Sequence, residues 1–156
     1  SEKFDTFIGA LDQTTCKPAK GYISVADRND LRLHFIFSAA LQVIANSGVS
    51  FSIGELKELL DSRGGGSGFS FADLAADRAG IRFAELAIDD AGAKHLQKMA
   101  AELTKEAVFF PTIADLPEGI RQQEFEQQGG IESEFYNKHL AIIEQRIDTL
   151  KLFQAR

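Results

Sequence analysis

The chain has 156 residues, of which 44% are hydrophobic and 26% are charged, and its formal net charge is -6. That length fits one domain with one hydrophobic core, and that composition argues against extended disorder. The negative charge, with no basic stripe to offset it, argues against a nucleic-acid partner. No segment is apolar for long enough to predict a membrane span, and a single cysteine, Cys16, excludes an intramolecular disulfide.

The N-terminal part of the chain predicts an irregular lead-in over residues 1–26, followed by a helix. Between Leu31 and Ala45 almost every position is apolar, which predicts a helix that is buried on most sides. The exceptions are spaced four residues apart and therefore form one polar stripe along the helix. The members of this polar stripe are Asp30, His34, Ser38 and Gln42.

Two later helices begin with the same local signal. Residues 51–56 combine a capping box with a hydrophobic staple and predict a helix to about Ser62, followed by the glycine-rich loop 64–68. Residues 69–74 repeat the pattern, with Ser70 as the N-cap, and predict a helix to Ile88. The glycine-rich loop is not interpreted as a phosphate-binding loop, because it lacks the required lysine and follows no predicted strand. It is interpreted as a connector between helices, with a flexible flap over a nearby site as the alternative.

The second half of the chain predicts further helices. One runs from Asp89 or Asp90 to about Glu106, a short one spans 118–128, and the last spans about 133–153. Strand signals are weak, with Phe109–Ile113 as the one modest candidate. The last helix carries apolar residues at alternating steps of four and three, the seam of a bundle or coiled coil: Tyr136, Leu140, Ile143, Ile147 and Leu150. The sequence therefore predicts an all-α, single-domain bundle of five or six helices.

His34 is the first residue with potential chemistry, because it lies on a helix that is otherwise nearly apolar. A buried imidazole must satisfy its ring nitrogens, since an unpaired buried polar group costs about 1–3 kcal/mol. One interpretation is a core histidine that is hydrogen-bonded to a carboxylate or a carbonyl group. The other is a general base or a metal ligand.

Three carboxylates share one face of the helix predicted over residues 52–62, because Glu55, Glu58 and Asp61 are three positions apart. Glu55 is accounted for by the capping box. Glu58 and Asp61 have no such role, so they belong either to a solvated face or to a site.

Asp73 and Asp77 lie one turn apart on the following predicted helix. Capping explains Asp73. Asp77 lies beside a small-residue face that includes Gly80 and favours close packing, so it would need a partner when buried. His34 and Arg78 are the expected partners.

The segment from His34 to Asp77 therefore holds a histidine and several carboxylates on three consecutive predicted helices. Such a set can bind a metal ion, here through His34, Glu58 and Asp61. It can equally form a hydrolytic site with His34 as base, Glu58 and Asp61 as acid, and Asp77 orienting His34. No metal-binding motif of fixed spacing is present, so the pattern specifies no cofactor.

Several of these residues form a pattern that resembles one in small predicted periplasmic lipoproteins of bacteria, a group of uncharacterised function. The resemblance covers about a third of the chain, from Leu31 to Ile81. Its elements are His34-Phe35, Lys57-Glu58, Asp61, the glycine-rich loop, Asp73-Leu74, Asp77 and Gly80. It implies an exported bacterial protein and groups His34, Glu58, Asp61, Asp73 and Asp77 into one set, without implying a reaction. The long helical second half departs from the pattern.

Two functions follow as hypotheses for an exported or periplasmic protein. The first is a non-catalytic binding or interaction module with a buried His/carboxylate network, whose helix over 133–153 meets a protein partner or a second copy. The alternative is a metal-binding or hydrolytic enzyme that uses His34, Glu58, Asp61 and Asp77. The first is preferred because nothing in the sequence specifies a reaction.

Overall fold

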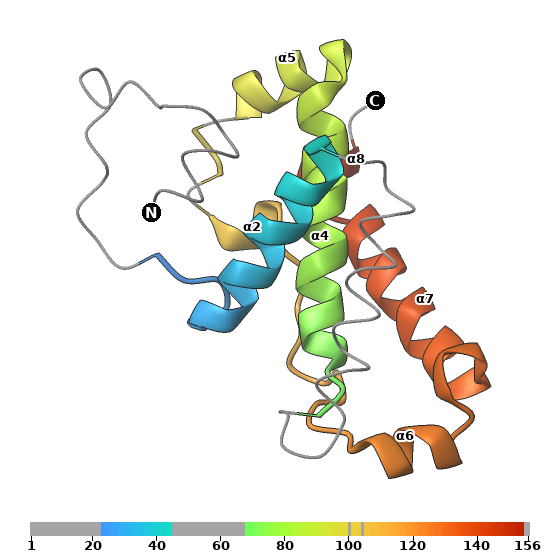
Figure 1. Cartoon of the computed structure of the whole chain (residues 1–156). Coiled ribbons are helices and arrows are strands. Elements are labelled where there is room, and N and C mark those ends of the chain that lie inside the picture. The colour runs from blue at the N-terminus through green and yellow to red at the C-terminus, as the bar shows by residue number, and fades with distance from the viewer. Residues whose placement is uncertain (1–22, 45–67, 100, 104, 155–156) are drawn as a thin grey trace.

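A computed structural model describes residues 23–44, 68–99, 101–103 and 105–154, and these residues form an all-α bundle, as predicted (Figure 1). Their α-helices are α2 (Asn29–Ile44), α4 (Phe71–Ile88), α5 (Asp90–Met99), α6 (Gln122–Gln127), α7 (Glu134–Asp148) and α8 (Lys151–Gln154). Two 3-10 helices, η1 (Glu106–Val108) and η2 (Gly130–Glu132), lie in the connections. The helix predicted over residues 52–62 lies outside the described residues, as do residues 64–67 of the glycine-rich loop.

Helix α4 is the central element, with α2 on one side and α7 on the other (Figure 1). Phe71, Leu74 and Ile81 are at most 1% exposed, and most of the remaining α4 residues are buried too. The predicted N-cap is confirmed, because Ser70 Oγ accepts a hydrogen bond from the backbone N–H of Asp73 at 3.1 Å. Local capping therefore sets where the central helix begins.

Helices α2 and α4 run in the same direction and approach each other closely (Figure 1). A Cβ atom at Gly80 would collide with the backbone carbonyl oxygen of Phe35 in α2. The ring of Phe35 packs edge-on against Phe83 and Phe109, with centroids 5.7 and 5.9 Å apart. A glycine in α4 thus allows a contact that a larger residue would prevent.

The sidedness of α2 differs from the prediction that this helix is buried on most sides. Its buried residues are Leu31, His34, Ser38 and Gln42. Three members of the polar stripe therefore face the protein interior, and only the first member, Asp30, is exposed. Its large apolar side chains are exposed by 38–60% and are named the outer stripe: Leu33, Ile36, Phe37, Val43 and Ile44. The prediction was wrong because apolarity alone does not decide burial: carboxylates on α4 provide partners for polar side chains of α2.

Helix α7, in contrast to α2, turns its apolar side chains toward the core. Tyr136, Ile143 and Ile147 of the predicted seam are at most 2% exposed. Ser133 caps the helix, since its Oγ accepts a hydrogen bond from the backbone N–H of Tyr136 at 3.0 Å. The helix predicted over 133–153 is divided, because α7 ends at Asp148 and α8 begins at Lys151.

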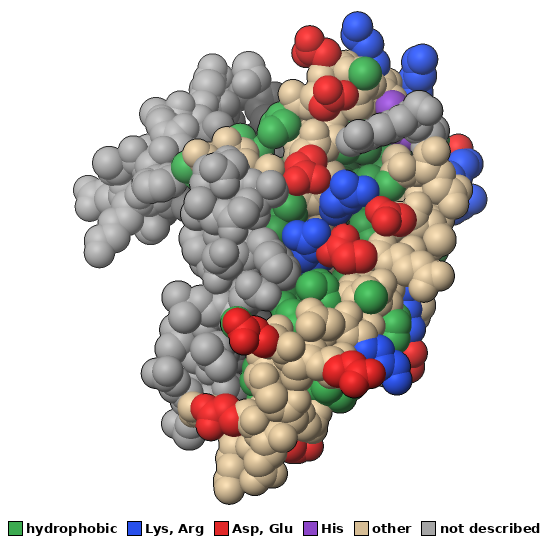
Figure 2. All heavy atoms as spheres, turned by 90° about the vertical axis from the view of Figure 1, so that its right-hand side faces the viewer, with side chains coloured by type: hydrophobic (Ala, Val, Ile, Leu, Met, Phe, Trp, Pro, Cys, Tyr) green, Lys and Arg blue, Asp and Glu red, His purple; other side chains and the backbone are tan. Residues whose placement is uncertain are grey.

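Ion pairs supplement the apolar contact between α4 and α7. Arg78 pairs with Glu144, and Arg82 pairs with Asp148 at 2.9 Å. Basic and acidic side chains are interspersed over the face of the molecule that Figure 2 shows. These pairs are partly exposed, so each is expected to contribute about 1 kcal/mol or less.

The second half of the chain contains less helix than predicted. Helix α5 ends at Met99 rather than near Glu106, α6 begins at Gln122, and residues 109–113 form no strand. The described residues contain only isolated β-bridges, one of which joins Phe69 to Ile120 through backbone hydrogen bonds of 2.7 and 3.0 Å. This bridge holds residues 117–120 against the start of α4.

Candidate functional site

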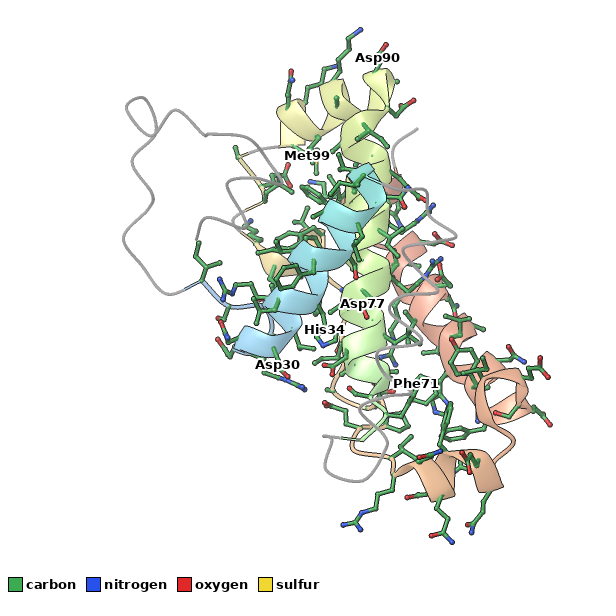
Figure 3. All side chains as sticks on the ribbon, in the orientation of Figure 1. Asp30, His34, Phe71, Asp77, Asp90 and Met99 are labelled. Atoms are coloured by element: carbon green, nitrogen blue, oxygen red, sulfur yellow. The ribbon has the colours of Figure 1, made fainter. Side chains whose placement is uncertain are left out.

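The expected contact between His34 and Asp77 is present at the interface of α2 and α4 (Figure 3). His34 Nδ1 lies 3.1 Å from Asp77 Oδ1, and the same oxygen accepts a hydrogen bond from Ser38 Oγ at 2.6 Å. A carboxylate only accepts hydrogen bonds, so Nδ1 carries the proton in this contact. His34 is 8% exposed and Asp77 is 3% exposed, so the pair is largely shielded from water.

The other ring nitrogen of His34 faces a second carboxylate. His34 Nε2 lies 3.5 Å from Asp73 Oδ2, on a side chain that is 10% exposed. Asp73 lies in the first turn of α4 as predicted, but capping does not account for its whole role, because its carboxylate lies between His34 and Arg28. A carboxylate therefore faces each ring nitrogen of His34.

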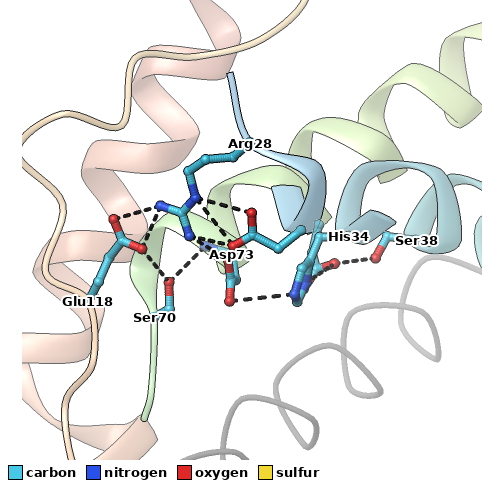
Figure 4. Close-up of polar contacts among 8 residues, drawn as sticks. Arg28, His34, Ser38, Ser70, Asp73 and Glu118 are labelled. Carbon is cyan, nitrogen blue, oxygen red and sulfur yellow. Dashed lines mark hydrogen bonds and ion pairs between the residues drawn. The ribbon is translucent and has the colours of Figure 1, made fainter. Parts of the chain in front are cut away.

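Arg28 connects Asp73, and through it His34, to the surface of the protein (Figure 4). Its guanidinium group lies 3.6 Å from Asp73, 2.6 Å from Asp30 and 2.7 Å from Glu118. The hydrogen bond to Asp30, reinforced by Glu118, raises the pKa of Arg28 above its ordinary value despite partial burial. The same guanidinium holds the pKa of Asp30 below its ordinary value.

These contacts form one continuous set, named the α2–α4 network. Its members are Arg28, Asp30, His34, Ser38, Ser70, Asp73, Asp77 and Glu118. Ser70 belongs to it because its Oγ donates to Glu118 Oε2 at 3.5 Å. The network therefore joins three separate parts of the chain: the start of α2, the start of α4 and the segment around Glu118.

A pocket of about 260 Å³ opens beside the network. It is lined by Arg28, Asp30, His34, Gly68, Ser70, Asp73, Glu118 and Gly119. Three of these side chains are carboxylates and two are basic, so the lining has an excess of negative charge. Backbone forms one wall, where Gly68 has a φ of 91° and a Cβ atom on it would collide with the backbone of Gly119.

The structure brings together only part of the predicted set. His34, Asp73 and Asp77 meet between α2 and α4, whereas Glu58 and Asp61 lie outside the described residues. Over the described ranges, no three His, Cys, Asp or Glu side chains are grouped so that they could hold a metal ion. The proposed metal set of His34, Glu58 and Asp61 therefore stays a prediction.

Sequence reasoning missed Arg28 and Glu118, which lie 90 positions apart and outside any helix. Neither residue belongs to a periodic pattern, and only the fold brings them together. Their contact closes one side of the pocket, so an essential part of the site has no local signal in the sequence.

Comparison with known proteins adds no relative: no protein-family model matches the chain, and no similar protein was found among curated sequences or solved structures. In the part of the chain that the structure describes, no helix combines the length and apolarity needed to cross a membrane. The case for a function therefore depends on the geometry of the site.

Proposed function

We propose that the protein is a non-catalytic binding module in which the α2–α4 network fixes the walls of an acidic pocket. The observation that carries this proposal is the position of the His34 ring, 3.1 Å from Asp77 and 3.5 Å from Asp73. A general base needs a nitrogen that faces its substrate, whereas both ring nitrogens of His34 already face carboxylates of the protein. The arrangement suits a network that pins α2 to α4.

The ligand proposed for the pocket carries an ammonium or guanidinium group. Asp30, Asp73 and Glu118 supply three carboxylates, and Arg28 already contacts all three of them. An added cation would offset the remaining negative charge, and a guanidinium can pair with a carboxylate through two parallel hydrogen bonds. The pocket volume of about 260 Å³ is below the range of about 300–1,000 Å³ for pockets that hold drug-sized ligands. It therefore suits a small cationic group, such as the end of one lysine or arginine side chain.

Titration with n-propylguanidinium and n-propylammonium ions tests this ligand class, with propionate as the control of opposite charge. We expect saturable changes in the backbone amide resonances of Ser70 and Gly119 with the two cations only. Asp73→Asn should weaken the binding about ten-fold or more, a loss of about 1.4 kcal/mol. The matched control is Asp115→Asn, whose carboxylate is 69% exposed and pairs with Arg146 away from the pocket. Equal responses to propionate, or an unchanged affinity in Asp73→Asn, would contradict the proposal.

Separate substitutions of His34 and Asp77 test the structural role of the network. A structural network predicts that His34→Ala and Asp77→Asn each lower the free energy of unfolding, by up to about 3–5 kcal/mol when a buried pair is broken. Urea denaturation followed by circular dichroism measures both effects. Unchanged or increased stability in both variants would argue against a structural network.

The alternative function is a metal-binding or hydrolytic site at His34, Glu58, Asp61 and Asp77. One observation favours it, because a carboxylate at Nδ1, as Asp77 is here, commonly orients a catalytic or metal-ligating histidine. Titration of the wild-type protein with Zn²⁺ and with Mg²⁺ by calorimetry tests the metal. Saturable binding that His34→Ala loses without a loss of stability would replace the binding-module proposal.

We further propose that the chain belongs to an exported, periplasmic bacterial protein. The support is the resemblance to predicted periplasmic lipoproteins. Among the residues of that pattern, His34 contacts both Asp73 and Asp77, and Gly80 sets the approach of the two helices. Fractionation of bacteria that express the full-length protein tests this, and recovery from the cytosol alone would contradict it.

A further inference from the structure

We propose that the outer stripe of α2 is the docking surface for a second copy of this chain, in a symmetric dimer. Its five large apolar side chains are exposed by 38–60% on one side of a single helix. Isolated exposed apolar residues are common, but a contiguous set on a helix marks a surface that another molecule covers. This inference is independent of the acidic pocket, because the stripe lies on the side of α2 opposite the buried His34, Ser38 and Gln42.

The spacing of the stripe fits another helix. Leu33, Phe37, Ala40 and Ile44 follow one another at steps of four, three and four, and Ile36 and Val43 flank this line. Alternating steps of four and three produce the seam along which two helices interlock. Ala40 is exposed at the middle of the seam, where a small side chain lets a second backbone come close. A flat partner would not require this spacing.

The absence of charged residues from the stripe is compatible with its pairing with the same stripe on a second copy. From Leu33 to Ile44 the sequence contains no Lys, Arg, Asp or Glu, although the chain has a net charge of -6. In a symmetric dimer the same patch contributes both halves of the interface. Any charged group near its axis would face its own copy, so a stripe without charges avoids that repulsion.

The area of the stripe indicates a weak dimer. A phenylalanine side chain has roughly 150–250 Å² of surface. With Phe37 and four aliphatic side chains exposed by 38–60%, the stripe offers an area on the order of 500 Å². Two such patches bury about 1,000 Å² in total, which is near the lower limit for a specific interface. We therefore expect reversible association with a dissociation constant in the micromolar range.

The structure also changes which helix is available to a partner. The sequence predicts a partner or a second copy at the helix over 133–153, through its apolar seam. Tyr136, Ile143 and Ile147 of that seam are at most 2% exposed, because they fill the core of the protein itself. The surface of α2 offers what the seam of α7 does not: large apolar side chains that remain open.

Sedimentation equilibrium over a range of protein concentrations tests the dimer. We expect the wild-type protein to associate reversibly and Phe37→Asp to raise the dissociation constant about ten-fold or more. The matched control is Ile131→Asp in η2, where the isoleucine is 42% exposed but isolated from the stripe. A second measurement uses Cys16→Ser as background: Ala40→Cys should cross-link two chains under mild oxidation, and Ile131→Cys should not.

Three results would overturn the proposal. The wild-type protein could remain monomeric at every concentration, or Phe37→Asp could associate as tightly as the wild type. The monomer could also float with phosphatidylcholine vesicles and lose this property in Phe37→Asp, which would assign the stripe to a lipid surface instead.

Discussion

Helices α2 and α7 both pack against α4, but they place their polar and apolar side chains in opposite ways. On α7 the apolar Tyr136, Ile143 and Ile147 face the core. On α2 the inward side chains include His34 and Ser38, and large apolar side chains face outward. The difference teaches that the inward face of a helix depends on the partners that the neighbouring helix offers. Helix α4 presents carboxylates to His34 of α2 and arginines to the acidic side chains of α7.

The strongest test of this comparison is to place a carboxylate on the inward face of α7. Ile143 is fully buried among apolar side chains, so Ile143→Asp would bury a charge without a partner. We expect the free energy of unfolding to fall by at least about 4–5 kcal/mol, the extreme range for single substitutions. Urea denaturation at low protein concentration measures it.

The matched control for this test is Phe37→Asp on the outer stripe, where the side chain is 59% exposed. The stability of the monomer should change by about 1 kcal/mol or less, as is usual for surface substitutions. If both variants were equally destabilised, the two helices would not differ in the way described.

A second test moves α2 away from α4. Gly80→Ala places a Cβ atom against the carbonyl oxygen of Phe35, and overpacking of this kind costs about 1–3 kcal/mol. On an exposed helix the same change would stabilise by about 1 kcal/mol, so the sign is decisive. Urea denaturation gives the sign, and the ring resonances of His34 should shift if its distance to Asp77 grows.

A smaller effect is expected at the start of α7. Ser133 accepts a hydrogen bond from the backbone N–H of Tyr136 at 3.0 Å, and loss of an N-cap costs about 1 kcal/mol. Ser133→Ala should therefore lower the melting temperature slightly. Ser24→Ala, outside any helix, is the control and should leave it unchanged. No difference between the two would mean that apolar packing alone defines α7.

The smallest effect concerns the pH dependence at the start of α2. The hydrogen bond from Arg28 lowers the folded-state pKa of Asp30. Its contribution to stability is therefore present above the ordinary pKa of an aspartate, about 3.9, and is lost as the pH falls through the folded-state pKa. Asp30 is 51% exposed in its side chain, so solvent screening limits the effect to less than about 1 kcal/mol.

Comparison of the wild-type protein with Asp30→Asn measures this effect. The difference between their free energies of unfolding should be present at neutral pH and should shrink below about pH 4. A difference that stays constant down to strongly acidic pH would contradict the assigned cause. Ile143 and its apolar neighbours do not titrate, so this inward face of α7 should give no such pH dependence of stability. The two helices therefore differ in this property as well.

Local features of the sequence predicted much of the fold. The predicted cap at Ser70 is present in the structure, because a cap depends only on neighbouring residues, and the structure adds a cap at Ser133 that was not predicted. The proximity of His34 and Asp77 was also predictable, since a small residue at Gly80 indicated close packing. Element lengths were less predictable, and the last predicted helix proved to be two.

The features that the sequence could not predict depend on tertiary contacts. The contact of Arg28 with Glu118 joins positions 90 residues apart in irregular segments. The polar stripe of α2 faces inward because α4 supplies carboxylates as partners. The sequence of α2 alone gives no information about those partners. Asp73 was assigned to capping, and its contacts with His34 and Arg28 exist only once the helices have packed.

The segment around Glu118 is held mainly by its backbone. Ile120 exchanges two hydrogen bonds with Phe69, and the carbonyl oxygen of Pro117 accepts a third from Phe71. None of these bonds involves the side chain of Glu118, so the backbone of this wall stays in place even when the contact of Glu118 with Arg28 is lost. Gly68 lacks the freedom to change, because a Cβ atom on it would collide with the backbone of Gly119. A substitution at position 118 would therefore change the charge that lines the pocket without rebuilding the scaffold.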